Sequence, residues 1–260
     1  MSSSPKLRGK SALVTAGAQG IGLATSRALL DAGCDVFVHY HTSLAGAEEL
    51  AAHAASLGRT FGHAAGDLTT PDGGEKLVAS AVAALGGLDV LINNAGSLVA
   101  RHTLDTIDDA FWSHVMALNV ESMVRVSRAA APHLATAAKT SGGASIVNLS
   151  SLAGRKGGHA GSLAYSTAKG AVLTFTRALA NELGPQGIRV NALAPGLILG
   201  TSFHNTHTTD ASAQATIAAI PLGVAGKPED VARAVVFLAG EFDGFISGAT
   251  LDINGGVWAG

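Results

Sequence analysis

The stretch VTAGAQGIG (residues 14–22) decides how the fold of this 260-residue chain is interpreted. It follows a short apolar run at residues 11–15 and leads into a helical pattern at residues 21–33. Its three glycines are Gly17, Gly20 and Gly22. Their spacing, G-x-x-G-x-G, differs from the G-x-G-x-x-G of the standard dinucleotide-binding fingerprint. By itself, the stretch is either a phosphate-binding loop with a different glycine spacing or a tight strand-to-helix turn without a ligand.

The alternation of short apolar runs and longer helical patterns continues along the whole chain. Besides the first strand at residues 11–15, strands are predicted at residues 35–40, around 59–65, and at 88–96, 145–151, 188–196 and 250–255. Helices are predicted at residues 21–33 and 44–58, after Pro71, and at residues 165–183. Strands followed by helices of this length form right-handed βαβ units around a parallel sheet.

We therefore predict an α/β fold with a Rossmann-type, doubly wound, parallel sheet of seven strands in three layers (helix, sheet, helix). The chain shows no internal repeat and no change in composition that would divide it. Residues 1–260 are expected to form a single domain.

Composition and charge exclude several classes of protein. Hydrophobic residues make up 47% of the chain, charged residues 14%, and the net charge is −2, which gives no basic surface for nucleic acid. The single cysteine, Cys34, excludes an intrachain disulfide and indicates a reducing compartment. Residues 1–10 lack the apolar core of a signal peptide, and no apolar run reaches the roughly 18 residues of a membrane helix. We expect a soluble, cytoplasmic protein without nucleic-acid or membrane partners.

The polar clusters of this chain fall just after predicted strands, where ligands bind to parallel α/β sheets. In the strand–loop–helix context of residues 14–22, backbone N–H groups and the helix N-terminus form a site for an anionic phosphate. Gly20 and Gly22 lack Cβ atoms, so a pyrophosphate can approach and the helix can pack tightly on the strand.

Tyr165 and Lys169 lie four residues apart in AYSTAKGA and therefore share one face of a predicted helix. A phenol has a pKa near 10, and a nearby ammonium group favours the phenolate. Such a pair can transfer a proton near neutral pH, as carbonyl–alcohol interconversion requires. The alternative is an exposed tyrosine and lysine without a catalytic role.

Ser151 ends the predicted fifth strand, 14 residues before Tyr165, and a glycine-rich loop joins them. The loop can fold back, so the Ser151 hydroxyl can bond the carbonyl oxygen that Tyr165 protonates. Ser150 is expected to point the opposite way along the strand.

In combination, the motifs resemble the short-chain dehydrogenase/reductase family. They are TAGAQGIG, NNAG at residues 93–96, Asn119 in ALNV, Ser151, YSTAK at residues 165–169, and RVNALAPG at residues 189–196. GKPEDVA and SGATLDINGG near the C-terminus also resemble family segments. The resemblance extends roughly from Lys6 to Gly256, and within the family the chain is similar to 3-oxoacyl carrier-protein reductases.

The resemblance implies a dinucleotide-binding catalytic domain that interconverts a ketone or aldehyde and an alcohol with NAD(P)(H). Tyr165 would donate the proton in reduction and accept it in oxidation. Lys169 would lower the pKa of Tyr165 and bind the nicotinamide ribose, and Ser151 would orient the carbonyl. Asn119 would anchor a water that connects Lys169 to solvent.

The cofactor contacts implied by the resemblance come from the carboxyl ends of several strands. Asp67 would bond the adenine ring with Leu68 beside it, residues 94–96 would line the adenosine ribose, and residues after the sixth strand would contact the nicotinamide. The full set is Thr15, Gly17, Gln19, Gly20, Ile21, Gly22, Tyr40, His41, Thr42, Ser43, Asp67, Leu68, Asn94, Ala95, Gly96, Tyr165, Lys169, Pro195, Gly196, Ile198 and Thr201.

Three positions depart from the family pattern. Ala16 stands where the family has its first glycine, and we expect Ala16 to keep a negative φ while Gly17 supplies the conformational freedom of the turn. The spacing from Ser151 to Tyr165 is one residue longer than in many members. The family's threonine after the Pro-Gly segment falls on Gly200, with Thr201 one position late.

The end of the second predicted strand favours NADP(H) over NAD(H). A carboxylate there would bond the ribose hydroxyls of NAD and repel the 2′-phosphate of NADP. Tyr40 occupies this position, and the next carboxylate is Glu48. HYHTS (residues 39–43) resembles a segment of NADPH-dependent pteridine reductases, so His41, Thr42 and Ser43 are candidates to bind a 2′-phosphate. Gln19 argues for NAD(H), because relatives that use NADP often carry Arg or Lys there.

Residues 197–223 are predicted to form a mobile substrate lid. Ser97, Leu98 and Val99, with His159 and Leu163, are expected to line the pocket. We favour an NADPH-dependent 3-oxoacyl or ketone reductase. The alternatives are an NAD-dependent sugar or polyol dehydrogenase and, from another class, a non-catalytic nucleotide-sensing protein.

A metal site is not expected, because His204, His207 and Asp210 lack further ligands nearby in the sequence. The family resemblance implies a homotetramer that acts on a small-molecule substrate.

Overall fold

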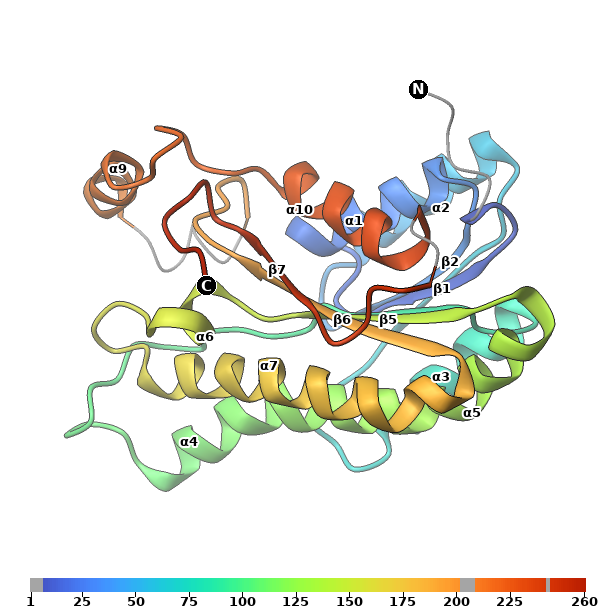
Figure 1. Cartoon of the computed structure of the whole chain (residues 1–260), viewed down its shortest axis with the longest axis horizontal. Helices are drawn as coiled ribbons and strands as arrows, with labels where there is room; N and C mark the ends of the chain where they lie inside the picture. The colour runs from blue at the N-terminus through green and yellow to red at the C-terminus, as the bar shows by residue number, and fades with distance from the viewer. Residues whose placement is uncertain (1–6, 202–208, 242–243) are drawn as a thin grey trace.

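Seven parallel strands form one sheet in the computed structural model, which describes residues 7–201, 209–241 and 244–260 (Figure 1). The strands are β1 (Ser11–Val14), β2 (Asp35–Tyr40), β3 (Phe61–Ala65), β4 (Val90–Asn93), β5 (Ala144–Leu149), β6 (Ile188–Pro195) and β7 (Thr250–Ile253). Their order in the sheet is β3-β2-β1-β4-β5-β6-β7, and all neighbours are parallel. The predicted Rossmann-type sheet is confirmed.

Helices cover both faces of the sheet, and each of the strands β1 to β6 contributes to two cores (Figure 1). One face packs on α1 (Gly20–Asp31), α2 (Leu44–Leu57) and α10 (Pro228–Val236), and the other on α3 (Gly73–Leu85), α5 (Ser122–Ser141) and α7 (Leu163–Leu183). Successive strand side chains alternate between the faces. In β1, Ala12 and Val14 enter the first core and Leu13 the second. Burial on both faces explains why the strands are apolar without interruption.

Shorter elements surround the carboxyl ends of the strands or cap the helices. They are α4 (Asp109–Met116), α6 (Leu152–Lys156), α9 (Asp210–Ala218), the π-helical turns η2 (Ala117–Glu121) and η4 (Phe237–Glu241), and the 3-10 turn η3 (Gly184–Gln186). The predicted helix ends agree with the structure at Gly58, which has φ +63° and caps α2 in the left-handed conformation.

A buried polar network crosses the second core. The Asn93 side-chain amide donates to the Asn148 side-chain oxygen (2.9 Å) and to the Ser127 hydroxyl (3.0 Å), and the Asn148 amide donates to the Thr176 hydroxyl (3.0 Å). These bonds connect β4 and β5 with α5 and α7. They pair the buried amide groups that donate, whereas the Asn93 side-chain oxygen has no partner among the described residues.

The order of strands reverses between β1 and β4. From β1 the chain proceeds outward to β2 and β3, and from β4 it proceeds in the other direction to β5, β6 and β7. The two connections diverge at the carboxyl ends of β1 and β4 and leave a crevice, which is where ligands bind to such sheets.

Two boundaries differ from the sequence prediction for a physical reason. The fourth strand was predicted to reach residue 96, but it ends at Asn93, because the Asn94 side chain turns back to bond the carbonyls of Thr15 and Ala16. The segment between Ser151 and Tyr165 was predicted to be a loop throughout. It contains α6, because the Ser151 hydroxyl accepts a hydrogen bond from the Ala153 N–H and caps the N-terminus of this helix.

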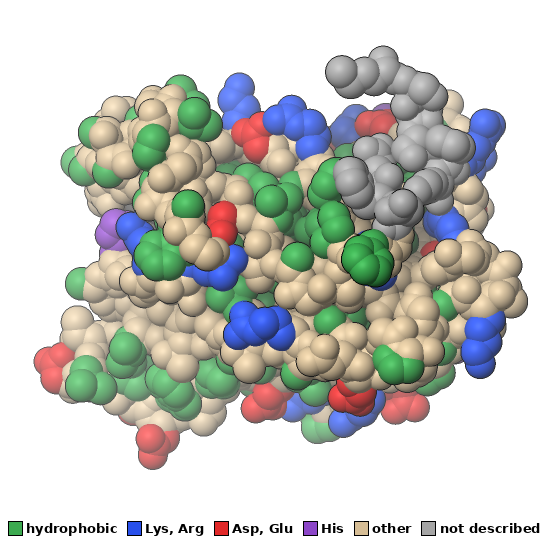
Figure 2. Space-filling model, in the orientation of Figure 1, with side chains coloured by type: hydrophobic (Ala, Val, Ile, Leu, Met, Phe, Trp, Pro, Cys, Tyr) green, Lys and Arg blue, Asp and Glu red, His purple; other side chains and the backbone are tan. Residues whose placement is uncertain are grey.

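Acidic and basic side chains are interspersed over the face shown in Figure 2. Within the described part of the chain, none of the helices combines the length and the apolar character that a membrane span requires.

Candidate active site

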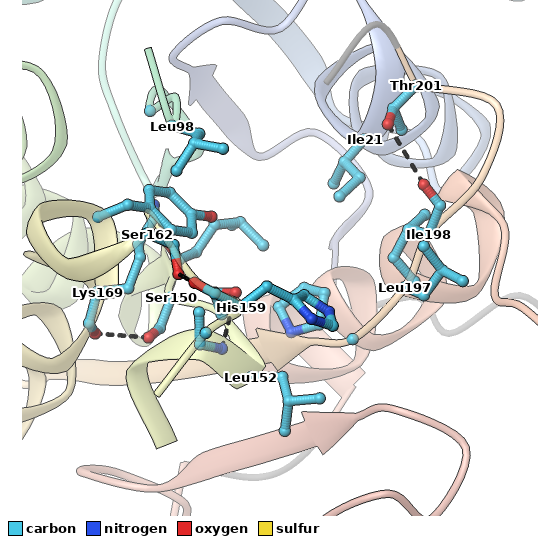
Figure 3. A pocket seen from close by; sticks show the side chains of 18 of the residues that line it. Ile21, Leu98, Ser150, Leu152, His159, Ser162, Lys169, Leu197, Ile198 and Thr201 are labelled. Carbon is cyan, nitrogen blue, oxygen red and sulfur yellow. Dashed lines mark hydrogen bonds between the residues drawn. The ribbon is translucent and has the colours of Figure 1, made fainter. Parts of the chain in front are cut away.

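A pocket of about 950 Å³ opens at the carboxyl ends of the central strands (Figure 3). It is lined by the loop after β1, the first turn of α1, the segment after β4, the region from Ser150 to Tyr165, the segment after β6, and α9. Thirteen of the predicted catalytic and cofactor-binding residues line it: Gln19, Gly20, Ile21, Gly22, Asn94, Gly96, Ser151, Tyr165, Lys169, Pro195, Gly196, Ile198 and Thr201. The fold therefore brings together residues from across the sequence.

Ser151 and Tyr165 are hydrogen-bonded through their side chains at the floor of this pocket. Ser151 is held because it caps α6, with its oxygen 3.1 Å from the Ala153 nitrogen. Tyr165 lies in the first turn of α7. A Cβ atom on Gly154 would lie 2.6 Å from the Lys169 carbonyl carbon, so only glycine lets α6 pack this closely on α7. This packing sets the distance between the two hydroxyls.

Lys169 is buried beside Tyr165. Its Nζ donates to the Leu149 carbonyl (2.8 Å) at the end of β5 and lies 5.8 Å from the centre of the Tyr165 ring. The Ser150 hydroxyl donates to the Lys169 carbonyl (2.7 Å), and both Ser150 and Ser151 line the pocket. The lysine is thus fixed at both its backbone and its ammonium group.

Asn119 lies in the π-helical turn η2 and is buried. Its side-chain amide donates to the carbonyls of Ser97 (2.8 Å) and Val115 (2.9 Å), and its oxygen accepts from the Ser97 N–H (3.1 Å). A Cβ on Gly96 would lie 2.6 Å from the Asn119 oxygen and 2.9 Å from Lys169 Nζ. The glycine therefore allows both groups to approach the same point, and the predicted water link between them remains a prediction.

Burial is the largest influence on the pKa values of Tyr165 and Lys169. It raises the pKa of Tyr165 to about 12, although the hydrogen bond with Ser151 acts in the opposite direction, and it lowers the pKa of Lys169 to about 8. The sequence predicted that Lys169 would lower the pKa of Tyr165. In this structure the shift has the opposite sign, because the loss of water around the phenol outweighs other effects, and Tyr165 is a neutral acid at pH 7.

The prediction that Ala16 keeps a negative φ and that Gly17 supplies the conformational freedom of the turn is wrong. Ala16 has φ +49°, whereas Gly17 is outside the left-handed region. Ala16 is held in this conformation because its N–H donates to His39 Nδ1 (3.1 Å) and its carbonyl accepts from Asn94 (3.1 Å). Gly17 is required for space, since a Cβ there would lie 2.9 Å from both the Val14 oxygen and a Val38 methyl group.

His39 is a residue that the sequence analysis missed. It is buried in β2, its Nδ1 accepts from the Ala16 N–H, and its Nε2 lies 3.0 Å from the Gly66 carbonyl. These partners assign the neutral tautomer with the proton on Nε2, and burial lowers the pKa of His39 in agreement. The signal in the sequence was a polar residue in the middle of an apolar strand. His39 positions the glycine loop over the ends of β2 and β3.

Thr15 and Asn94 tie the glycine loop to the segment after β4. The Thr15 hydroxyl accepts from the N–H groups of Asn94 (2.9 Å) and Ala95 (3.0 Å), and the Asn94 side chain donates to the carbonyls of Thr15 and Ala16 (3.1 Å each). Their side chains therefore shape the site in addition to any contact with a nucleotide.

The N-terminus of α1 suits an anionic group. Gln19 is its N-cap residue but its side chain makes no capping bond, and the first turn carries no acidic residue. The Gln19 side chain instead accepts from the Ser43 hydroxyl (2.7 Å). The N–H groups of this turn and the positive end of the helix dipole therefore face the pocket beside Gly20, which fits a pyrophosphate.

The predicted adenosine contacts lie beyond the glycine loop, at the ends of β2 and β3. Tyr40 ends β2 and is followed by His41, Thr42 and Ser43. Asp67 accepts from the N–H and the hydroxyl of Thr69, which lowers the pKa of its carboxyl group. The Leu68 side chain is buried in the second core, so only its backbone is available to a ligand.

The expected substrate wall is correct in part. Ser97, Leu98 and His159 line the pocket, but Val99 packs against the cluster around Val115, and Leu163 is exposed at the start of α7. Arg101, Lys156 and Ser162 also line it and were not predicted, and Ser212 and Thr216 line it from the predicted lid segment.

Part of the predicted lid, including His204 and His207, lies outside the described residues. Where the structure does describe the chain, no three His, Cys, Asp or Glu side chains gather in a way that would hold a metal ion.

Comparisons with known proteins assign the class. A family model described as enoyl-(acyl carrier protein) reductase matches residues 15–258. The chain is 34% identical to a 3-oxoacyl-[acyl-carrier-protein] reductase of Vibrio cholerae (97% of this chain, 98% of the other) and 33% identical to the 2-dehydro-3-deoxy-D-gluconate 5-dehydrogenase of Escherichia coli (96% of each).

Solved structures agree with these matches. An NADH-dependent reductase, A1-R', complexed with NAD superposes with a TM-score of 0.87 at 33% identity, covering 98% of each chain. A short-chain dehydrogenase from Burkholderia cenocepacia in complex with NADP gives 0.88 at 33% identity, covering 97% of this chain and 99% of the other. The protein is an oxidoreductase of the class that uses nicotinamide cofactors. It belongs to the short-chain dehydrogenase/reductase family.

The conformation of the glycine loop leads to a test of stability. Ala16→Gly should raise the free energy of unfolding by about 1 kcal/mol, because it removes a Cβ from the left-handed region. Gly17→Ala should lower it by about 2 kcal/mol, because the added methyl group has no room. Urea unfolding of both variants measures these changes. Equal, small effects at the two positions would contradict the structure.

The buried Lys169 leads to a test of pH dependence. The folded protein holds this pKa near 8 and the unfolded chain near 10.5, so the unfolded state binds more protons between these values. The stability of the wild type relative to Lys169→Met should therefore rise by about 3 kcal/mol from pH 7.5 to pH 10.5. Urea unfolding across this range measures the difference, with the exposed Lys139→Met as control. A flat difference would show that Lys169 is not desolvated.

Proposed function

We propose that the protein reduces a ketone to an alcohol with NADPH as the preferred cofactor, as in 3-oxoacyl reductases. The observation that carries the proposal is the meeting of Ser151, Tyr165 and Lys169 in the same pocket as the glycine loop. A bound nicotinamide supplies the hydride. The residues of this chain bind and orient the carbonyl and provide the proton.

The roles of the side chains follow from their fixed positions. Ser151 and Tyr165 present two hydroxyl groups that can bond one carbonyl oxygen, which polarises the carbonyl and places the phenolic proton where negative charge develops. Lys169 adds a positive charge that favours the phenolate once the proton has left. Because the pKa of Tyr165 is raised, the phenol is in the protonated form that reduction needs.

The preference for NADPH rests on the end of β2. Residues 39–43 contain no carboxylate, and the first acid after them, Glu48, lies in α2. Ser43 and Gln19, joined by their hydrogen bond, place a hydroxyl and an amide near the expected ribose. One protein of similar fold is complexed with NAD and another with NADP. The preference for NADPH is therefore argued from the residues of this chain and not from these structures.

A sugar-acid or polyol dehydrogenase is the second candidate. The hydroxyl groups of Ser97, Ser162, Ser212 and Thr216 on the pocket wall favour a polar substrate. A relative of nearly the same identity is named as a dehydrogenase of 2-dehydro-3-deoxy-D-gluconate. A purely nucleotide-sensing role is disfavoured, since such a role does not need Tyr165 and Lys169 together. Turnover of ketones and of polyols by the same preparation separates these candidates.

We also propose a homotetramer in the cytoplasm as the working form, following the family resemblance. Light scattering combined with gel filtration measures the oligomeric state.

The role of Tyr165 can be tested with Tyr165→Phe, which removes one hydroxyl group. We expect kcat/KM for ketone reduction to fall by about a thousandfold, because the proton donor is lost. The Kd for NADPH, measured by fluorescence, should stay within about twofold, since the phenol contributes little to ground-state binding of the nucleotide. Full activity of this variant would exclude the mechanism.

The cofactor preference can be tested with Tyr40→Asp. A carboxylate at the end of β2 should weaken NADPH binding by about a hundredfold through repulsion of the 2′-phosphate, while NADH binding is retained or improved. Tyr40→Asn is the matched control without charge. If the wild type already prefers NADH, the proposed preference is wrong.

A further inference from the structure

We propose that the substrate carries a carboxylate, which binds to Arg101, Lys156 and His159 at the outer end of the pocket. The inference rests on the proposed reduction of a carbonyl compound and specifies the class of its substrate.

The acidic or basic residues that line the pocket are all basic. Beside Lys169, the ionisable groups other than Tyr165 are Arg101, Lys156 and His159, and no Asp or Glu of the described chain lines the pocket. The whole chain has 19 acidic and 17 basic residues, so its overall composition does not explain this lining. A local excess of positive charge raises the concentration of an anionic substrate at the pocket.

The three residues belong to one connected unit of structure. Arg101 follows β4, Lys156 ends α6, and His159 lies between α6 and α7. The two segments are joined because the His102 N–H donates to the Gly161 carbonyl (3.0 Å) and the Arg101 guanidinium donates to the Ala160 carbonyl (3.2 Å). Residues His102 and Ser162 also form a parallel bridge. The two segments that carry these basic residues are therefore held together.

This unit lies away from the expected pyrophosphate site. The glycine-loop end of the pocket is marked by Ile21 and Thr201, and Figure 3 shows both across the pocket from Ser162 and Leu98. Arg101 belongs to the Ser162 end, because a Cβ on Gly161 would lie 2.8 Å from the Arg101 Cβ. His159 projects into the pocket between Leu152 and the segment after β6 (Figure 3). The expected phosphate site at α1 is therefore separate from these basic residues.

The chemistry of the unit fits a carboxylate. A guanidinium group binds a carboxylate with two parallel hydrogen bonds, and an ammonium group adds a point charge. Leu98 and Leu152 also line the pocket and suit a short carbon chain. Arg101, Lys156 and His159 are exposed, so an anion can reach them from solvent.

The experiment compares oxo acids with their methyl esters, which keep the ketone and lose the charge. Binding of 4-oxopentanoate and 5-oxohexanoate, and of each ester, is measured by calorimetry with NADP+ present, for the wild type, Arg101→Met, Lys156→Met and the double variant. Lys139→Met, an exposed lysine in α5 outside the pocket, is the control. Arg101→Lys keeps the positive charge, so it distinguishes loss of charge from a change in loop structure caused by replacing Arg101.

We expect the wild type to bind each acid at least tenfold more tightly than its ester. Each single Met variant should reduce this ratio by about threefold to tenfold, and the double variant should abolish it, because each removes one charge-assisted contact. Lys139→Met should leave the ratio unchanged, and Arg101→Lys should preserve most of it. Equal binding of acid and ester by the wild type, or loss of the ratio in the control, would overturn the inference.

Ketone turnover separates this inference from the proposed function. If the esters are reduced but the acids show no advantage in binding, the reductase proposal stands and the carboxylate proposal fails. If the acids bind selectively but no ketone is reduced in the presence of NADPH, the carboxylate site stands and the reductase proposal fails.

Discussion

The site depends on the hydrogen bonds that tie the end of β1 to the end of β4. At this point the strand order reverses, so no further ladder bonds can hold the two diverging segments together. Thr15 and Asn94 replace the ladder with side-chain bonds in both directions, and His39 adds a third attachment through Ala16. As a result, the glycine loop and the segment that leads to Gly96 are one rigid unit. The phosphate end of the pocket and the lysine end keep a fixed separation.

The arrangement of Ser151, Tyr165 and Lys169 depends on two glycines as much as on these side chains. Gly154 allows α6 to pack against the backbone of Lys169, and Gly96 leaves room for the lysine ammonium and the Asn119 side chain. A Cβ atom at either glycine would lie 2.6 Å from its nearest neighbour, which is closer than a side chain can approach. The hydroxyl groups of Ser151 and Tyr165 can therefore be positioned without support from a mobile segment, which reduces the ordering required when a substrate binds.

The strands, their parallel arrangement and the closeness of Tyr165 and Lys169 could be predicted because each depends on local patterns. Apolar runs identify strands buried on both faces, and the spacing of Tyr165 and Lys169 follows from helical periodicity. The conformation of Ala16 could not be predicted, because it results from bonds to His39 and Asn94, which are distant in the sequence. The pKa of Tyr165 could not be predicted either, since it depends on burial in the assembled fold. The basic lining formed by Arg101 and Lys156 arises from two segments that meet only in three dimensions.

The amide network of the second core selects the alignment of the strands. In a parallel sheet of apolar strands, sliding β4 against β5 by two residues would keep similar side chains on each face. Such a slip would separate Asn93 from Asn148 and leave buried amides without partners, at a cost of about 1–3 kcal/mol for each group. The network therefore discriminates against misaligned folding products. Asn94 and Ser150 directly follow β4 and β5. The alignment of these two strands therefore also determines which residues meet in the pocket.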